Sequence, residues 1–261
     1  MPAGPSATPE SEETLTINRD CWNQAARKFH GGTALPTYGP LAPTEDTLRL
    51  LGPFAGTRVL ELGCGSGHSL RYAAEQGAAE VWGLDLSPVQ IAFATEVLQP
   101  FHPRVRLFES AMEVNPGIPA NHFDLVISIY GLGWTTDLAA TLTLAAGYLK
   151  PGGTLVFSGE HPAYRCAEYS NEQYVLVRPY TEEGPEFKTS WSGAPTVLQR
   201  RTLATFVNGV VKAGFRLEAL IESELNADGE GHADPSRWYS IPRARLIPTT
   251  FVIKARKPMG E

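Results

Sequence analysis

The stretch VLELGCGSG, residues 59–67, is the most informative part of this 261-residue sequence. A short, mostly apolar run, as expected of a buried strand, leads directly into three glycines at alternate positions. Glycine allows backbone conformations that other residues avoid and lets a ligand approach the main chain closely. The pattern predicts a strand, a ligand-binding turn, and a helix over residues 67–75 that stops at Gly77.

The glycine spacing and the acid before it narrow the choice of ligand. A dinucleotide-binding turn needs Gly-x-Gly-x-x-Gly so that pyrophosphate can sit on the helix N-terminus, but His68 stands where the third glycine would fall. Glu61, two residues before Gly63, would repel phosphate and suits a ligand that carries an ammonium group. The sequence therefore disfavours NAD.

A second acid ends the next predicted strand, residues 81–85. Asp85 stands where a carboxylate can accept two hydrogen bonds from ribose hydroxyls. Ser87 as N-cap, Pro88 at the first helical position and Gln90 two residues later are signals that begin a helix. The glycine turn alone could serve tight packing, and Asp85 alone could be a helix-start charge. Together they predict a ligand site.

The rest of the chain alternates strands and helices. The other expected elements are strands over residues 104–108, 123–129, 154–158, 215–221 and 249–255, and helices over residues 137–149 and 203–211. Alternation at these lengths predicts a parallel sheet with helices on both faces. Residues 160–200 break the rhythm with scattered aromatic side chains and no clear period, so we expect an insertion there.

Composition limits the class of protein. An apolar fraction of 43% and a charged fraction of 19%, without a long apolar run, predict a soluble protein with no membrane span. A net charge of -6 with scattered basic residues argues against nucleic acid as a partner. Three cysteines without metal or disulfide spacing, and no visible secretory signal, favour a cytoplasmic protein without a metal site. We expect a disordered tail over residues 1–14 and one domain over residues 15–261.

Four motifs in order resemble the class I S-adenosylmethionine-dependent methyltransferases, specifically the small-molecule enzymes of bacteria. VLELGCGSG looks like their first motif, GLDLS (residues 83–87) like the second, FDLV (123–126) like the fourth-strand motif and LKPGG (149–153) like the turn before strand five. The resemblance covers most of the chain. It implies a Rossmann-like, doubly wound α/β fold with strand order 3-2-1-4-5-7-6 and the last strand antiparallel.

The resemblance also implies which residues bind S-adenosylmethionine. Gly63, Gly65 and Gly67 would lie against its methionine part, Glu61 beneath that loop, and Asp85 at the ribose. Further cofactor contacts are expected from Leu86, Gln90, Ser110, Ala111, Met112 and Ile129.

Two outlying segments resemble a subgroup whose N-terminal helix and following loop close over the cofactor. These are Cys21-Trp22-Asn23 and Thr37-Tyr38-Gly39-Pro40. Residues 17–45 are therefore expected to form a helix and cap, with Tyr38 as a cofactor contact. Plain packing of Trp22 onto the domain is an equal alternative.

The acceptor is expected beyond the carboxyl ends of strands four and five, because open parallel sheets bind their ligands there. The residues with a possible basic group at these strand ends are Tyr130, Glu160 and His161. His161 is our first candidate for a general base, since imidazole titrates in the useful range, and Tyr130 is the second. Trp134 has no basic nitrogen and can only line a substrate pocket. A structural role stays open for both His161 and Tyr130.

The insertion and the helix after it carry the other substrate predictions. Related sequences often place a histidine before the Arg-Thr-Leu that opens the late helix, whereas this chain has Arg200. Arg200 cannot act as a base, but it can bind a carboxylate or a phosphate, unless it is simply a solvated arginine. Residues 160–200 are expected to cover the substrate. Their aromatic side chains could equally form a satellite core or a dimer contact.

The resulting hypothesis is methyl transfer from S-adenosylmethionine to a small molecule, with secondary metabolism as the expected setting. One alternative keeps the cofactor site but diverts it to cyclisation, either of the cofactor's own aminobutyryl chain or of a bound substrate. Another is a non-catalytic binding module. The sequence leaves open the acceptor, the attacked atom, and whether the protein is a monomer or a homodimer.

Overall fold

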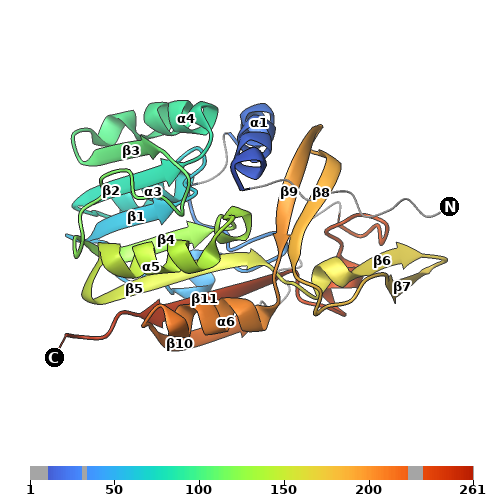
Figure 1. Ribbon diagram of the computed structural model, residues 1–261. Helices are drawn as coiled ribbons and strands as arrows, with labels where there is room; N and C mark the ends of the chain where they lie inside the picture. The colour runs from blue at the N-terminus through green and yellow to red at the C-terminus, as the bar shows by residue number, and fades with distance from the viewer. Residues whose placement is uncertain (1–10, 31–33, 223–231, 261) are drawn as a thin grey trace.

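The computed structural model describes residues 11–30, 34–222 and 232–260. Its centre is a seven-stranded sheet in the order β10-β11-β5-β4-β1-β2-β3 (Figure 1). The strands are β1 Arg58–Leu62, β2 Glu80–Asp85, β3 Val105–Glu109, β4 Phe123–Ile129, β5 Leu149–Glu160, β10 Arg216–Glu222 and β11 Thr250–Arg256.

The observed sheet confirms the predicted order and orientation. Counted along the chain within this sheet, the order is 3-2-1-4-5-7-6. β11 runs antiparallel to both β5 and β10, while the pairs among β1 to β5 are parallel. In β1, every residue from Val59 to Leu62 is buried, as expected of a strand covered on both faces.

Helices cover both faces of the sheet. The helices are α1 Ser11–Phe29, α2 Glu45–Leu48, α3 His68–Glu75, α4 Pro88–Leu98, α5 Leu138–Tyr148, α6 Leu203–Lys212 and α7 Ile241–Ala244, with short 3-10 turns η1 Gln99–Phe101, η2 Leu132–Trp134 and η3 Tyr164–Cys166. One core cluster joins the sheet to α5 and α6, and a second joins it to α3 and α4. The Ser87 hydroxyl accepts a hydrogen bond from the Gln90 amide at 3.2 Å, so α4 begins where its sequence signals predicted.

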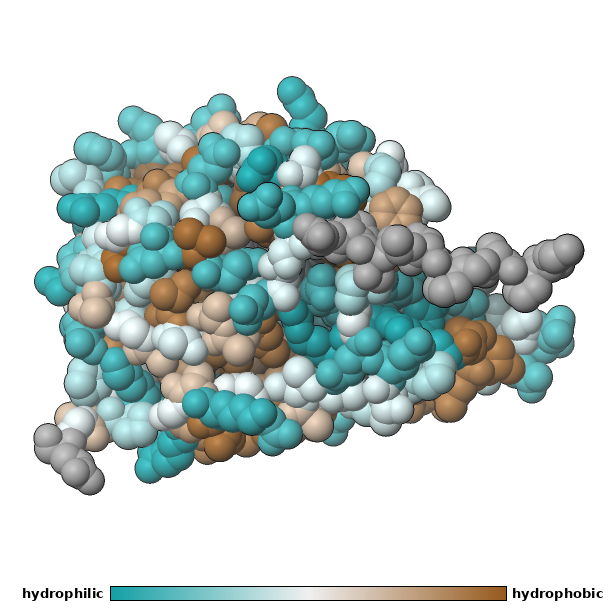
Figure 2. Space-filling model, viewed as in Figure 1, coloured by the Kyte–Doolittle hydropathy of each residue, from teal (hydrophilic) through white to brown (hydrophobic). Residues whose placement is uncertain are grey.

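The insertion after β5 forms two antiparallel hairpins. The first pairs β6 Ala167–Ser170 with β7 Gln173–Leu176, and the second pairs β8 Gly184–Trp191 with β9 Ala194–Arg200. Figure 1 shows the second hairpin beside α1. In Figure 2 a hydrophobic patch lies at the β6–β7 end of the molecule, where Leu176 and Val177 are exposed.

A buried asparagine ties α1 to this second hairpin. The Asn18 side-chain amide donates to the Val197 carbonyl at 2.9 Å, and its oxygen accepts from the Val197 amide and the Thr196 hydroxyl, both at 2.9 Å. Because Asn18 is 1% exposed, breaking these bonds would leave buried polar groups unpaired. These hydrogen bonds therefore hold the N-terminal helix against the insertion.

The predicted tail is too long. α1 begins at Ser11, and Thr14 is buried, so the expectation of disorder is wrong for residues 11–14. Glu12 and Glu13 in the first turn suit the positive end of the helix dipole, which explains why an acidic stretch can start a helix. Residues 1–10 lie outside the described residues.

Candidate active site

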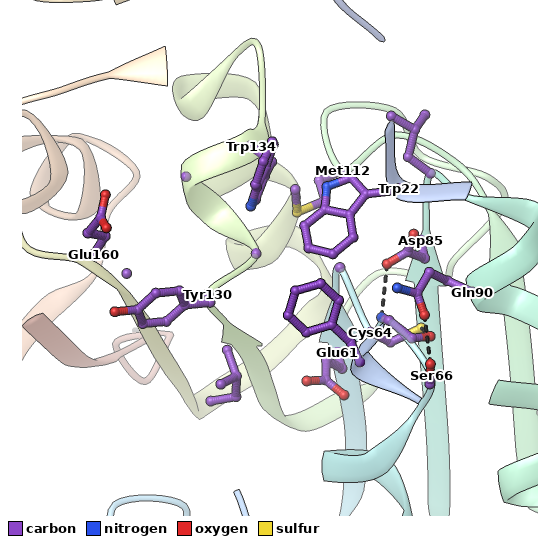
Figure 3. A pocket seen from close by; sticks show the side chains of 18 of the residues that line it. Trp22, Glu61, Cys64, Ser66, Asp85, Gln90, Met112, Tyr130, Trp134 and Glu160 are labelled. Atoms are coloured by element: carbon purple, nitrogen blue, oxygen red, sulfur yellow. Dashed lines mark hydrogen bonds between the residues drawn. The ribbon is translucent and has the colours of Figure 1, made fainter. Parts of the chain in front are cut away.

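A cavity of about 950 Å³ lies at the carboxyl ends of the central strands. Its walls come from the glycine loop after β1, the ends of β2, β4 and β5, the helix α1 and the β8–β9 hairpin. Figure 3 shows Glu61, Cys64 and Asp85 at one end and Glu160 at the other. The cavity therefore joins the predicted ligand loop to the predicted acceptor side.

The glycine loop approaches this cavity closely. Gly63 and Gly65 both line it, with φ angles of 70° and 50° in the left-handed region that side chains disfavour. A Cβ atom on Gly63 would lie 3.3 Å from the Gly131 Cα and 3.6 Å from the Met112 Sδ. Gly63 therefore keeps space open where the loop faces the end of β4.

Asp85 connects this loop to the start of α4. One carboxylate oxygen accepts the Gly65 amide and the other accepts the Ser87 amide, each at 2.9 Å. Burial raises the pKa of Asp85 to about 6, against the lowering effect of these backbone hydrogen bonds. The Ser66 hydroxyl donates to the Gln90 side-chain oxygen at 2.7 Å, which makes a second tie (Figure 3). The loop is thus held in place from α4.

Glu61 is a buried acid with an unsatisfied oxygen. It is 3% exposed, and its Oε2 has no hydrogen-bond partner among the described residues. The pKa of Glu61 is raised to about 8, mainly by burial. The charge of Asp85 adds to this shift, and a hydrogen bond with Ser69 opposes it. Since buried polar groups normally have partners, this oxygen is available to accept a hydrogen bond from a bound ligand.

Aromatic side chains form the other part of the cavity wall. Trp22 from α1, Trp134 from η2 and Trp191 from β8 contact one another edge to face, with ring centroids 5.0 to 5.2 Å apart. All three line the cavity, as predicted for Trp134. The N-terminal helix, the loop after β4 and the insertion therefore meet at this wall.

Glu160 closes the far end of the cavity. Its Oε1 accepts hydrogen bonds from the Trp238 indole and the Tyr239 hydroxyl, each at 2.7 Å, and its Oε2 lies 3.2 Å from the Arg165 Nε. Three donors thus already occupy this carboxylate. Trp238 and Tyr239 were not among the predicted site residues, because no periodic pattern in the late loop singles them out.

Comparison with known proteins decides the family. A family model described as a methyltransferase domain matches residues 59–153. An uncharacterized protein from Haemophilus influenzae is 32% identical over 223 residues, which is 80% of this chain and 85% of that protein. A crystal structure of an S-adenosylmethionine-dependent methyltransferase from Mesorhizobium loti is 30% identical, covers 81% of this chain and 96% of its own, and superposes with a TM-score of 0.67. This chain belongs to the class I S-adenosylmethionine-dependent methyltransferases.

A third relative of this methyltransferase is a ubiquinone biosynthesis O-methyltransferase from Bradyrhizobium. It is 27% identical over 188 residues, which is 70% of this chain and 73% of the relative. The matched family model runs from β1 to the beginning of β5 and so includes the glycine loop and Asp85. S-adenosylmethionine is therefore the cofactor of the methyltransferase whose fold is shown in Figure 1.

The residues of the methyltransferase fit that cofactor. The unpaired Glu61 oxygen can accept a hydrogen bond from its ammonium group, and Gly63 and Gly65 bring the backbone of the loop to the cavity wall where its aminobutyryl chain would lie. Most of the other predicted cofactor residues also line the cavity, namely Leu86, Gln90, Ser110, Ala111, Met112 and Ile129. Their contacts with the cofactor itself stay predictions.

Cofactor affinity is expected to depend on pH through Glu61. With a pKa of about 8, this carboxyl is mostly protonated at neutral pH in the free protein, yet it must ionise to pair with an ammonium group. Affinity for S-adenosylhomocysteine should therefore rise by up to about tenfold per pH unit between about pH 6.5 and 8, with release of a proton. Calorimetric titration in buffers of different ionisation enthalpy measures both quantities.

The free energy of unfolding of the unliganded methyltransferase should fall as the pH rises, whereas cofactor affinity should rise. The folded pKa of Glu61 lies above its unfolded value of 4.5, so its contribution is fully present below pH 4.5 and is lost as the pH rises through 8. Glu61→Gln should flatten both profiles. An unchanged slope of affinity against pH in this variant would assign the pH dependence to another group.

Two predicted cofactor contacts do not line the cavity. Tyr38 is fully buried and its hydroxyl donates to Glu45, so the prediction that it touches the cofactor is wrong, although Thr37 and Pro40 beside it do line the cavity. Gly67 packs against α4 instead, because a Cβ there would lie 3.2 Å from the Ala94 Cβ. Its positive φ serves the start of α3.

His161 is not placed as a general base. It is 6% exposed and lies outside the described wall of the cavity. Its Nδ1 accepts the Ala163 amide at 3.2 Å and its Nε2 lies 2.8 Å from the Glu222 carboxylate, so both ring nitrogens are occupied. Neighbouring strand residues point to opposite sides, and here Glu160 points to the cavity.

His161→Ala is therefore expected to lower stability rather than turnover. Loss of two partly buried hydrogen bonds should reduce the free energy of unfolding by about 1 to 2 kcal/mol, measured by urea denaturation. Methyl transfer should stay within about twofold once the variant is folded. A stable variant with strongly reduced turnover would restore the histidine to the chemistry.

Tyr130 does line the cavity, but a hydrogen bond holds its hydroxyl in place. Its φ of 57° is in the left-handed region, and its hydroxyl lies 2.7 Å from the Thr250 hydroxyl. Burial raises its pKa well above the ordinary value of a phenol. A tyrosine that holds its proton this firmly is unsuited to act as a base near neutral pH.

Sequence reasoning did not name His68 as a site residue. It lines the cavity, and both its ring nitrogens are buried without a partner among the described residues. Arg200 lines a separate small chamber, where it lies 3.1 Å from Glu182.

In the part of the chain that the structure describes, no group of His, Cys, Asp and Glu is arranged to bind a metal, and no helix has the length and apolar character to cross a bilayer.

Proposed function

We propose that this methyltransferase alkylates a small molecule that binds at the tryptophan wall. The observation that carries the proposal is the continuity of one cavity from Glu61 and the glycine loop to Trp134 and Trp191, under the cover made by α1 and the β8–β9 hairpin. Concave, largely apolar cavities with aromatic walls suit molecules of drug-like size.

The chain contributes positioning more than proton transfer. S-adenosylmethionine, when bound, supplies an electrophilic methyl group. The tryptophan wall can orient a flat acceptor and exclude water, and correct alignment alone lowers the barrier of a displacement reaction substantially. His161 and Glu160 are occupied by other groups, and Tyr130 holds its proton. This supports acceptors that need little help from a base, such as neutral amines or groups already ionised.

A relative gives independent support. The Bradyrhizobium protein is named for O-methylation in the biosynthesis of ubiquinone, a small molecule, and it aligns over 70% of this chain. A place in secondary metabolism, a cytoplasmic location, and a monomeric or homodimeric state stay predictions from the sequence.

The test is a turnover assay that detects S-adenosylhomocysteine. Phenols, amines and carboxylic acids with one or two rings are compared with transfer RNA and unfolded protein as acceptors. We expect saturable turnover with at least one small molecule. Turnover with macromolecules only, or release of methylthioadenosine in place of S-adenosylhomocysteine, would contradict the proposal.

Two variants of β8 locate the acceptor. Trp191→Ala should raise the KM for the acceptor by about tenfold or more, because it removes a half-buried aromatic side chain from the cavity wall, while affinity for S-adenosylhomocysteine changes by less than about twofold. Phe187→Ala is the matched control, since Phe187 lies on the same strand but is 45% exposed and away from the described cavity wall. Equal effects of both variants would place the acceptor elsewhere.

A further inference from the structure

We propose that the acceptor carries an anionic group, a carboxylate or a phosphate, which binds in an arginine-lined chamber beside the tryptophan wall. This inference rests on the proposed function, because it names the class of small molecule that the cavity takes. It is carried by the position of the chamber, by the charges that line it, and by two buried guanidinium nitrogens without partners.

The chamber adjoins the acceptor end of the cavity. It has a volume of about 60 Å³ and shares Gly133, Gly159, Glu160 and Arg165 with the wall of the main cavity. Gly133 belongs to η2, next to Trp134, and a Cβ atom on it would meet no atom within 4 Å. Because a water molecule occupies about 30 Å³ in the liquid, the chamber has room for one small polar group.

Positive charge predominates in the lining. Four arginines and two glutamates line the chamber: Arg165, Arg178, Arg200, Arg201, Glu160 and Glu182. Two carboxylates outside the lining pair with these cations. Glu186 contacts Arg178 and Lys188 and lies 3.6 Å from the Arg165 Nη2, and Glu168 lies 3.5 Å from the Arg178 Nη2. Arg165 and Arg178 are therefore compensated, and Arg200 and Arg201 are the cations of the lining that a further anion could pair with.

Arg201 has the least compensation of the four. Its Nη2 donates to the Thr135 carbonyl at 2.6 Å, but its charge forms no ion pair within 4 Å among the described residues. Burial lowers the pKa of Arg201 to about 10, and the charges of Glu113, Glu183 and Asp137 oppose this shift. Glu113 and Glu183 already accept hydrogen bonds from threonines. The side chain therefore keeps a positive charge without a direct counter-ion.

Two side-chain nitrogens of the lining residues have no acceptor. The Arg200 Nε and the Arg201 Nη1 are buried, and neither has a hydrogen-bond partner in the described part of the chain. A buried donor left unpaired costs about 1 to 3 kcal/mol. Guanidinium groups bind carboxylates and phosphates through paired N–H donors, so one anionic group could satisfy both side chains.

Taken with the tryptophan wall, the chamber defines a substrate of two parts. An apolar or aromatic body lies against Trp134 and Trp191, and an acidic group reaches past Gly133 into the chamber. Glu182, whose side chain is 59% exposed, pairs with Arg200 from the solvent side and would compete with the acidic group for it. Removal of this carboxylate should therefore strengthen binding of the anion.

The test uses calorimetry on protein saturated with S-adenosylhomocysteine, with four probes of similar shape. These are 3-phenylpropionate, 2-phenylethyl phosphate, neutral 3-phenylpropanol and cationic 3-phenylpropylamine. We expect at least one anion to bind about tenfold or more tightly than the alcohol, and the amine to bind most weakly. Comparison of the two anions distinguishes a carboxylate site from a phosphate site.

Four variants decide whether the chamber causes this preference. Arg200→Gln and Gly133→Val should each remove the advantage of the anion over the alcohol, and Glu182→Gln should increase it severalfold. Arg216→Gln is the control, because that side chain is 72% exposed on β10 and does not line the chamber. Retained affinity for S-adenosylhomocysteine shows that a variant is folded.

The possible failures are distinguishable. Anion and alcohol of equal affinity, or a preference unchanged in both Arg200→Gln and Gly133→Val, would overturn the chamber proposal. If neutral small molecules are nevertheless methylated, the proposed function stands. If no small molecule is methylated in the turnover assay, the proposed function fails on its own evidence.

Discussion

Replacing Asp85 with alanine is expected to weaken the binding of S-adenosylhomocysteine by about a hundredfold and to reduce methyl transfer accordingly. The carboxylate orders the glycine loop through Gly65 and the start of α4 through Ser87, each at 2.9 Å. It is also the predicted acceptor for the ribose hydroxyls. Hydrogen bonds to a charged group contribute about 1.5 to 3 kcal/mol each, and about 1.4 kcal/mol corresponds to a tenfold change in affinity.

Asp85→Asn separates the two contributions. Asparagine keeps the size and one acceptor but places an amide donor against a backbone N–H, so an intermediate loss is expected. Asp46→Ala, on the short helix α2, removes an acid away from the described cavity wall and should leave binding unchanged. Affinity of Asp85→Ala within about threefold of the wild type would contradict the predicted ribose contact.

Gly63→Val is expected to abolish detectable cofactor binding and turnover. The φ of 70° is strained for any residue with a Cβ and most strained for a β-branched one. The new side chain would also start 3.3 Å from the Gly131 Cα, in space that faces the cavity. Calorimetry should show affinity reduced by more than about a hundredfold, and the melting temperature should fall by several degrees.

Gly147→Ala is the matched control for this change. Gly147 lies inside α5, its φ is not positive, and a Cβ atom there would meet nothing within 4 Å. Alanine should therefore leave cofactor binding intact and stabilise the helix by up to about 1 kcal/mol. Full cofactor binding by Gly63→Val would show that the loop does not face the ligand.

The strands of the sheet could be predicted because they are short and apolar and are followed by residues that favour turns or begin helices. VLEL before the glycines and the Ser-Pro start of α4 each specify a local structure by backbone chemistry alone. The order of the strands came from resemblance to a family. Local sequence does not encode which strands pair across the sheet, so composition and periodicity could not have supplied it.

The insertion was predicted but its two hairpins could not be, because its side chains obey no single period. On β8, Trp191 lines the cavity while Phe187 is 45% exposed, although both are aromatic residues on one hairpin strand. What packs Trp191 into the cavity wall is contact with Trp22 and Trp134, which are far away in the sequence. Such contacts appear only once the chain is folded.

The same limit explains the errors in the site. Glu160 and His161 are adjacent at the end of β5, and side chains on a strand alternate between faces, so an error of one residue exchanges the cavity for the interior. Tyr38 was assigned to the cofactor because its loop was expected to close over the cofactor, and Thr37 and Pro40 of that loop do line the cavity. The Tyr38 hydroxyl instead donates a hydrogen bond to the buried Glu45 carboxylate.

The central claim is that one cavity has a cofactor end at Asp85 and an acceptor end at Trp191. Calorimetric titration of S-adenosylhomocysteine into the wild type, Asp85→Ala and Trp191→Ala tests it most directly. We predict one-site binding to the wild type, a loss of about a hundredfold in Asp85→Ala and a change of less than about twofold in Trp191→Ala. Equal loss in both variants, or none in Asp85→Ala, would contradict this division of the cavity.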